Sequence, residues 1–234
     1  MCSRCVETTP RSARRRSVIP SFQQQVDRLV TLGYPALAGL DEDQLRHLVE
    51  PLRPAAEAIE GHTEESSPSQ VPFVLVVTRE LAAPESTVPL LRLVGPNGPG
   101  SRPGKVDRNH AGGDLANYHP VEDCTPPGAA YLLVGIERGE EFCNVRPEDA
   151  TATIRSRGRS PLTIDEGIAL VTQVPEVLEK NKCFMLAGSR RTSLPGDRRV
   201  PALWISERAP KLGWCWDGNP HTWLGTASAS RRAG

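Results

Sequence analysis

The four tryptophans of this chain lie close together in the sequence. Trp204, Trp214, Trp216 and Trp223 all fall within residues 200–225 of a 234-residue chain. Tryptophan has the largest side chain, and its ring either buries a large apolar area or stacks on a flat ligand. A segment that holds every copy therefore supplies either the main core of the fold or a binding surface. This choice constrains the fold, but it does not define a reaction.

Apolar runs of β-forming residues dominate the second half of the chain. With the turn residues between them, these runs predict strands at 73–77, 90–94, 131–136, 183–187, 200–206, 212–216 and 222–227. One helical segment interrupts them, because Thr163 and Glu166 form a capping box and Pro175 ends that helix or opens another at 176–180. The pattern predicts an α+β domain over residues 72–229, with one antiparallel sheet that carries a helix and a Trp-rich C-terminal hairpin.

The N-terminal part of the chain predicts a helical hairpin over residues 20–60. Residues 21–32 place apolar side chains at helical spacing. Asp41 and Gln44 then form a capping box that begins a second helix, and residues 55–59 add another turn. The hairpin is therefore expected as a separate helical unit before the strands.

The segments outside these two units have the composition of linkers and tails. Residues 61–71 contain Gly, Ser, Pro and acidic residues without an apolar period, which is typical of a linker. Residues 1–19 are basic and poor in apolar side chains, so we expect a disordered tail there. A second short tail is expected at 230–234.

The charge balance gives no sign of a polyanionic partner. The 28 basic and 28 acidic residues give a formal net charge of zero, so nucleic acid is not an expected partner on this ground. No apolar run approaches the ~18–20 residues of a membrane span, and no apolar segment follows the N-terminal arginines as a secretory signal requires. We therefore expect a cytoplasmic protein without a membrane partner, either monomeric or weakly oligomeric.

The cysteines give no framework of disulfides or metal ligands. Six are present, but a chain of this size without a signal sequence is expected among reduced thiols. Cys2 and Cys5 have the spacing of a zinc knuckle, yet no second pair matches them. We expect no metal and no cofactor.

Three long strings carry a resemblance to a known family. They are YLLVGIERG at 131–139, the segment 157–190, and the segment 198–229, and LGYPALAGL at 32–40 is similar as well. These strings resemble an actinobacterial family that is a domain of unknown function, whereas residues 95–119 fit it poorly. The resemblance implies a cytoplasmic bacterial protein and implies no activity, ligand or catalytic residue.

The Trp-rich hairpin is the leading candidate site. Trp214 and Trp216 are two residues apart, so on a strand their rings share one face while Cys215 points to the other. We expect Trp223, on the returning strand, to lie across from them and complete a surface that stacks a sugar, a base or a flat metabolite. Burial of the rings in the core is the alternative. The candidate ligand-binding residues are Trp214, Trp216, Trp223, Asn219, His221, Arg190 and Arg199. The expected function is a non-enzymatic module that binds an unidentified small molecule or protein partner.

An enzyme of unassigned class is the second hypothesis. Cys215 would be the thiol nucleophile, with His221 as base and Asp217 as the orienting carboxylate. Alternatively, a loop around His110 and His119 would carry the chemistry, since it also contains ligand types used by zinc and iron. That loop further includes Asp114, Asp123 and Cys124.

Binding of nucleic acid through arginine clusters is the third and weakest hypothesis. Residues 155, 157 and 159 are arginines that on an extended chain would all point the same way. A second cluster contains Arg190, Arg191, Arg198 and Arg199. If both clusters converged on one face, they would form a patch for anions or nucleic acid; solvated loop charge is the alternative.

Overall fold

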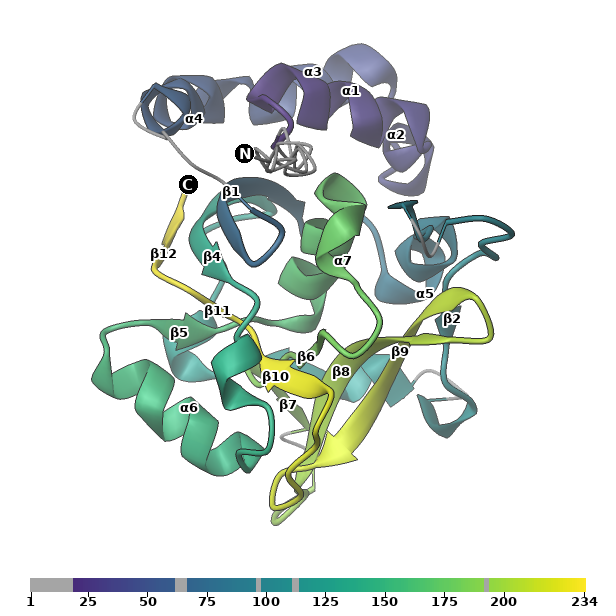
Figure 1. Cartoon of the computed structure of the whole chain (residues 1–234). Helices are drawn as coiled ribbons and strands as arrows, with labels where there is room; N and C mark the ends of the chain where they lie inside the picture. The colour runs from purple at the N-terminus through teal and green to yellow at the C-terminus, as the bar shows by residue number, and fades with distance from the viewer. Residues whose placement is uncertain (1–18, 62–66, 96–97, 111–113, 192–193) are drawn as a thin grey trace, which may run out of the picture.

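The computed structural model describes residues 19–61, 67–95, 98–110, 114–191 and 194–234. A layer of N-terminal helices covers a body of strands and further helices (Figure 1). The α-helices are α1 (Phe22–Thr31), α2 (Tyr34–Leu37), α3 (Glu42–Val49), α4 (Arg53–Glu60), α5 (Pro84–Thr87), α6 (Pro147–Ser156) and α7 (Ile164–Gln173). The strands are β1 (Gln70–Val77), β2 (Lys105–Val106), β3 (Tyr118–Pro120), β4 (Ala130–Glu137), β5 (Ser160–Pro161), β6 (Cys183–Met185), β7 (Ser189–Arg191), β8 (Arg199–Ser206), β9 (Ala209–Trp216), β10 (Leu224–Thr226), β11 (Ser228–Ala229) and β12 (Arg231–Ala233). The α+β class predicted from the sequence is confirmed.

Capping boxes begin three of the helices. Ser21 caps α1 through the Gln24 backbone N–H, and Asp41 caps α3 through the Gln44 backbone N–H. Thr163 and Glu166 form the equivalent pair at α7. In each case two of the four free backbone N–H groups at the helix start find a side-chain acceptor, so the predicted starts of α3 and α7 are confirmed.

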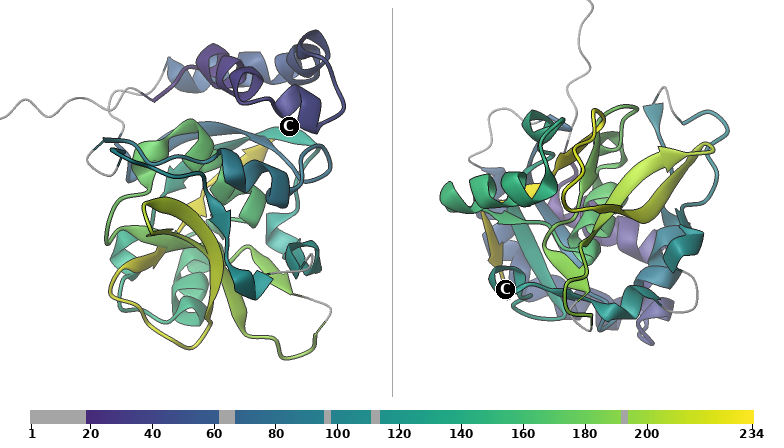
Figure 2. Two further views of the ribbon diagram at one scale, coloured as in Figure 1. Left: turned by 90° about the vertical axis from the view of Figure 1, so that its right-hand side faces the viewer. Right: turned by 90° about the horizontal axis from the view of Figure 1, so that it is seen from below.

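The first sheet is buried on both faces. Its strand order is β1-β4-β11-β5, and β12 also pairs with β4. Along β1, Phe73 and Leu75 pack with the N-terminal helices, whereas Val74 and Val76 pack into the main core beneath. This alternation follows from the two-residue period of a strand. The helices of residues 20–60 therefore share a core with β1 and β4, and the two views of Figure 2 show them lying along that sheet.

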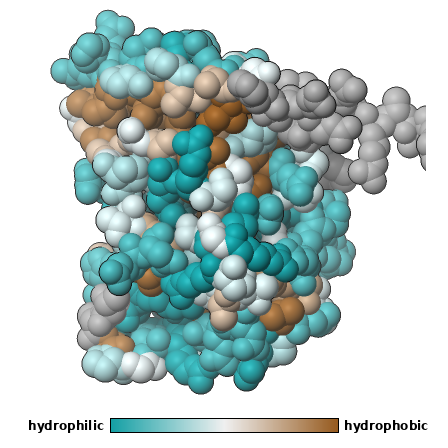
Figure 3. Space-filling view, turned by 90° about the vertical axis from the view of Figure 1, so that its left-hand side faces the viewer, coloured by the Kyte–Doolittle hydropathy of each residue, from teal (hydrophilic) through white to brown (hydrophobic). Residues whose placement is uncertain are grey.

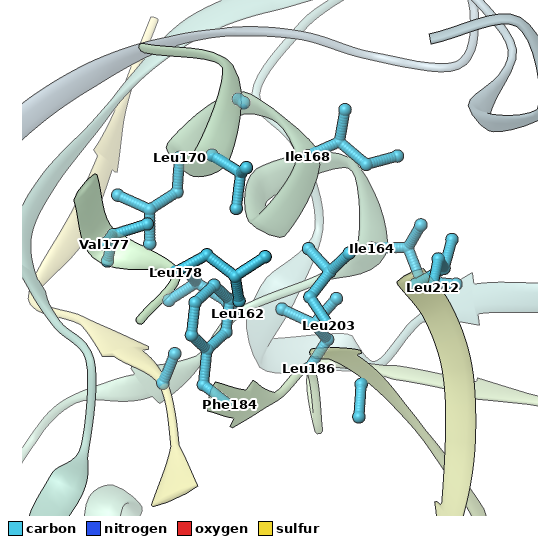
Figure 4. Close-up of a cluster of buried hydrophobic side chains, with 14 of the residues drawn as sticks. Leu162, Ile164, Ile168, Leu170, Val177, Leu178, Phe184, Leu186, Leu203 and Leu212 are labelled. Carbon is cyan, nitrogen blue, oxygen red and sulfur yellow. The ribbon is translucent and has the colours of Figure 1, made fainter. Parts of the chain in front are cut away.

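Helix α7 fills the centre of the molecule. All of its residues are buried, and its apolar side chains meet those of β6, β8 and β9 (Figure 4). Two carboxylates at its N-terminal end are also buried, and each has an arginine partner. Asp165 pairs with Arg79 at 2.8 Å, and Glu166 pairs with Arg232 at 2.6 Å.

The second sheet holds the Trp-rich segment. Its strand order is β10-β6-β8-β9-β2, and a separate two-stranded sheet joins β3 to β7. Strands β8 and β9 form a hairpin with a two-residue turn at Glu207 and Arg208, both at positive φ. The prediction of one antiparallel sheet was therefore wrong. Apolar runs mark strands but not their partners, and β10 pairs with β6 in parallel, as β2 does with β9.

Three segments differ from their predicted structure. Residues 90–94 are not a strand. The Leu91 carbonyl accepts from the Gly104 backbone N–H, and the Leu93 N–H donates to the Ser101 hydroxyl. These backbone groups therefore bond to the following loop and not to a neighbouring strand. The predicted helix at 176–180 is only a 3-10 turn, η8 (Pro175–Val177). The linker expected at 61–71 already contains the start of β1.

The two segments expected as tails are residues 1–19 and 230–234. Residues 1–18 of the N-terminal tail lie outside the described residues, and Ile19, its last residue, packs against the main core. The segment 230–234 is not a tail, because β12 pairs with β4 and Arg232 reaches Glu166. A basic side chain with a buried carboxylate partner holds this end in place, which composition alone does not reveal.

The surface agrees with this arrangement. On the face that carries α4 and β12, hydrophobic residues gather where the helical layer meets the sheet, and much of the rest is hydrophilic (Figure 3). Within the described part of the chain, no helix has both the length and the apolar character that crossing a bilayer requires.

Candidate functional site

The β8–β9 hairpin divides the tryptophans between two faces. Trp204 lies opposite Lys211 in the register, and Trp216 lies opposite Arg199. Because facing residues share a side of the sheet and neighbours along a strand alternate, Trp204 lies on one face and Trp214 and Trp216 on the other. The prediction that Trp214 and Trp216 share a face, with Cys215 on the opposite one, is confirmed.

The prediction that Trp223 lies across from Trp214 and Trp216 was wrong. Trp223 packs against Trp204 instead. The centroids of these two rings are 6.3 Å apart at an interplanar angle of 72°, and the His221 ring lies 5.7 Å from Trp223. A Cβ on Gly213 would lie 2.1 Å from the Trp204 ring, so glycine is required there for the ring to lie against the strand. The Lys211 ammonium sits 5.6 Å from the Trp204 centroid.

A pocket of about 450 Å³ opens beside this first Trp pair. Its apolar side comes from Trp204, Ile205 and Trp223, and its polar rim comes from the turn that follows η8. Lys180 and Asn181 belong to that rim, and the pocket is lined in full by Lys180, Asn181, Cys183, Trp204, Ile205, Ser206 and Trp223. Burial raises the pKa of Cys183 to about 11, so its thiol stays protonated at neutral pH.

The second Trp pair lies on the other face of the hairpin. The Trp214 and Trp216 centroids are 5.0 Å apart, and the Arg199 guanidinium lies 5.2 Å from the Trp214 centroid. Trp216 is 48% exposed, which is unusual for so large an apolar side chain. The Trp214 Nε1 is buried without a hydrogen-bond partner.

Cys215, Asp217 and His221 do not form a catalytic triad in this structure. Within the described residues no hydrogen bond joins Cys215 to His221, and the Asp217 carboxylate faces Arg190 at 3.4 Å instead. Burial raises the pKa of Cys215 to about 11 and lowers the pKa of His221. Both changes oppose a thiolate–imidazolium pair. Asn219 is exposed at the turn.

The loop around His110 and His119 is also divided. His110 is buried and its Nδ1 lies 2.9 Å from Asp114, whereas His119 is exposed on β3. Asp123 pairs with Arg155, and the Cys124 thiol donates to the Pro161 carbonyl. Among the residues that the structure describes, no group of three or more His, Cys, Asp or Glu is placed to hold a metal ion.

The arginines of both clusters face carboxylates. Residues 155, 157 and 159 do not form an extended row, because Arg155 lies on α6 and Arg157 caps that helix. Each of the seven arginines has an acidic neighbour within 4.0 Å, and the pairs are Arg155–Asp123, Arg157–Glu141, Arg159–Glu137, Arg190–Asp217, Arg191–Asp114, Arg198–Glu148 and Arg199–Asp197. The clusters therefore do not provide a run of unneutralised positive charge.

Sequence reasoning missed most of the pocket. Lys180, Asn181, Ile205 and Ser206 were not among the candidates, although Lys180 is the last residue of the helix predicted at 176–180. The one signal that points to them is Trp204 itself. The face of the sheet on which Trp204 lies, relative to Trp214 and Trp216, depends on the length of the turn at residues 207–208. The turn residues are Glu-Arg, which lack the Asn-Gly signature of two-residue turns.

Comparison with family models identifies the family of the chain. The model of a family of unknown function (DUF5701) matches residues 28–234. No curated protein and no solved structure matches the chain.

Proposed function

The chain belongs to this family of unknown function, and we propose that it binds a small molecule in the pocket beside Trp204 and Trp223. The observation that carries the proposal is a concave space of about 450 Å³ with two Trp rings on one side and a lysine at its rim. Small-molecule sites are typically clefts of ~300–1,000 Å³ with apolar walls and a few polar groups.

The polar rim indicates the class of ligand. Within the described residues Lys180 has no carboxylate partner, whereas Lys182 pairs with Glu179 at 3.2 Å and lies 4.0 Å from Glu140. Lys180 is therefore the cation that is free to meet an acidic group, and the Asn181 amide lies beside it. A planar ring that carries a carboxylate or phosphate would stack on Trp204 or Trp223 and place its anionic group at Lys180.

Other features of the molecule support a binding module over the alternatives. Within the described residues no hydrogen bond joins Cys215 to His221, and burial raises the pKa of the Cys215 thiol, which favours a binding module over thiol catalysis. The seven clustered arginines all have acidic neighbours, so these two clusters lack the unneutralised positive charge that nucleic acids need.

We further propose that the protein is bacterial and acts in the cytoplasm. Four cysteines in the described part of the chain are free thiols, which suits a reducing compartment. Large exposed hydrophobic side chains in that part are limited to Leu37, Leu48, Leu194 and Trp216. Since they are few, we propose a monomer or a weak homo-oligomer.

Ligand-observed NMR with a panel of probes tests the pocket. Benzoate, nicotinate and adenosine monophosphate present planar rings with a carboxylate or a phosphate. We expect at least one of them to bind saturably, with affinity reduced about 5- to 150-fold in Trp223→Ala, since stacking contributes ~1–3 kcal/mol. Lys180→Gln should also weaken binding.

Matched variants serve as controls. Trp216→Ala removes a ring from the opposite face, and Lys182→Gln removes a lysine that is already paired; both should leave the affinity unchanged. The proposal fails if no probe binds and native mass spectrometry of freshly purified protein finds no bound metabolite. It also fails if Trp216→Ala weakens binding as much as Trp223→Ala.

A further inference from the structure

A second pocket lies where the N-terminal helices meet the central helix. This α1–α7 pocket has a volume of about 390 Å³ and is formed by α1, by the C-terminal part of α7 and by the segment that follows α5. That segment contains the 3-10 helix η2 (Val88–Leu90). Figure 1 shows one end of α7 beneath the helical layer, with α5 beside it. The volume lies within the ~300–1,000 Å³ range of small-molecule sites.

The apolar walls of the α1–α7 pocket are aliphatic. They come from Leu32, Leu90, Leu91, Val171 and Pro175. Leu91 and Val171 are buried, and the other three are half-buried, so the apolar surface extends from the core to the solvent. Among the described residues that line this pocket none is aromatic, in contrast to the pocket beside Trp204. The walls therefore suit a flexible alkyl chain better than a planar ring that binds by stacking.

Two arginines of this pocket have no carboxylate partner in the part of the chain that the structure describes. The Arg28 Nη1 donates to two backbone carbonyls at the end of α7, at 3.1 and 2.9 Å. The Arg92 Nη1 donates to two backbone carbonyls of its own loop, at 2.7 and 2.8 Å. All four acceptors are neutral, and each guanidinium has further N–H donors. Both positive charges are therefore available to an anionic ligand, unlike those of the seven clustered arginines.

One carboxylate also lines the α1–α7 pocket. Asp27 is already held by the Arg46 guanidinium at 2.7 Å and by the Gln23 amide at 3.0 Å. Arg28 and Arg92 together with Asp27 give the lining a formal charge of +1. This charge is complementary to a monoanion and less suited to a cation or a neutral ligand.

We propose that the α1–α7 pocket binds an aliphatic monocarboxylate, the chemistry of a short- or medium-chain fatty acid. The alkyl chain packs on the leucines and Val171, and the carboxylate meets the guanidinium groups of Arg92 and Arg28. Arginine is well suited to this task, because its planar fork donates two parallel hydrogen bonds to one carboxylate. The site is separate from the pocket beside Trp204 and does not depend on the ligand proposed there.

Calorimetric titration of the full chain with butanoate, hexanoate and octanoate tests the alkyl part of the proposal. We expect saturable binding at a single site, with affinity that rises about fourfold for each buried methylene group, the equivalent of ~0.8 kcal/mol. Octan-1-ol has the same chain without the charge. It should bind about tenfold more weakly than octanoate, the equivalent of ~1.4 kcal/mol.

Arg92→Gln tests the carboxylate part. Arg92 is exposed and its hydrogen bonds stay within its own loop, so its loss should leave the melting temperature unchanged. The affinity for octanoate should fall about tenfold, the equivalent of ~1.4 kcal/mol. Arg28 is left intact because it also holds the end of α7. Arg102→Gln is the matched control, since Arg102 is likewise exposed but does not line the pocket.

Each result either supports or overturns the proposal. Octanoate affinity that increases with chain length and falls in Arg92→Gln, but not in Arg102→Gln, supports it. Absence of saturable octanoate binding overturns it, as does equal affinity for octanoate and octan-1-ol. Trp223→Ala should leave octanoate binding intact. If Trp223→Ala weakens that binding and Arg92→Gln does not, the carboxylate occupies the pocket beside Trp204 and the proposal is wrong.

Discussion

Replacing Arg232 with alanine should destabilise the fold far more than its place near the end of the chain suggests. Its guanidinium makes two hydrogen bonds with Glu166, one of 2.6 Å from Nε and one of 2.9 Å from Nη2. The Glu166 carboxylate is 0% exposed, and the Arg232 side chain is 8% exposed. The variant would therefore leave a carboxylate buried without its cation.

The expected cost follows from what Glu166 retains. The Tyr131 hydroxyl donates to one oxygen at 2.7 Å, and the Thr163 backbone N–H donates to the other at 2.7 Å. Neither of these donors carries a charge. Removing one partner of a buried ion pair typically costs ~3–5 kcal/mol, which is a large part of the ~5–15 kcal/mol that stabilises a domain. For a chain of this size the melting temperature should fall by about 6–20 °C.

Thermal and urea unfolding of matched variants measure this cost. Arg231→Ala is the control, because Arg231 precedes Arg232 on the same strand and is exposed. This variant should change the unfolding free energy by less than about 0.5 kcal/mol. Adding Glu166→Gln to Arg232→Met should restore part of the lost stability, since no buried charge then remains unpaired. Equal stabilities of Arg232→Ala and Arg231→Ala would refute this reasoning.

Two further predictions concern the cysteines and metals. Burial raises the pKa of Cys124 to about 12, so the folded state holds this proton more tightly than the unfolded chain. The free energy of unfolding should then fall as the pH rises above about 8.5, and Cys124→Ala should flatten that dependence in urea titrations at about pH 8 and about pH 10. The same pH dependence of the unfolding free energy in the wild type and in Cys124→Ala would contradict this prediction. We also expect a chelator and a reducing agent each to leave the melting temperature unchanged; stoichiometric zinc in elemental analysis would count against this prediction.

Local signals in the sequence predicted the helices that begin with a capping box, because the causes of such a start lie within a few residues. Helix α6, which has no side-chain cap, was missed. The capping boxes at Asp41 and Thr163 involve partners three residues away, and both helices begin where those pairs stand. Strand positions were also largely readable, since apolar β-formers mark β1, β4, β8 and β9. Their pairing was not, because the partner of β10 lies about forty residues earlier along the chain.

The candidate site was only partly predictable for the same reason. The predicted hairpin of strands 212–216 and 222–227 was wrong, because β9 pairs with β8 and β10 pairs with β6. The two-residue period correctly placed Trp214 with Trp216. The other pair, Trp204 with Trp223, depends on a turn with residues atypical for its geometry and on the return path of β10. The pocket beside Trp204 joins Lys180 to segments far apart in sequence, so periodicity and local motifs do not reveal it.

The path of the last strands has a consequence for how the protein is made. Within ten residues the chain adds β10 to one sheet and then β11 and β12 to the other, and it delivers Arg232 to Glu166. A ribosome releases these residues after all the elements that they join. Until then both sheets lack a strand and the central helix keeps a buried carboxylate without its cation. Synthesis thus leaves an incomplete nascent chain that exposes strand edges, the kind of species on which chaperones act. Closure of both sheets therefore waits for the emergence of a single short segment.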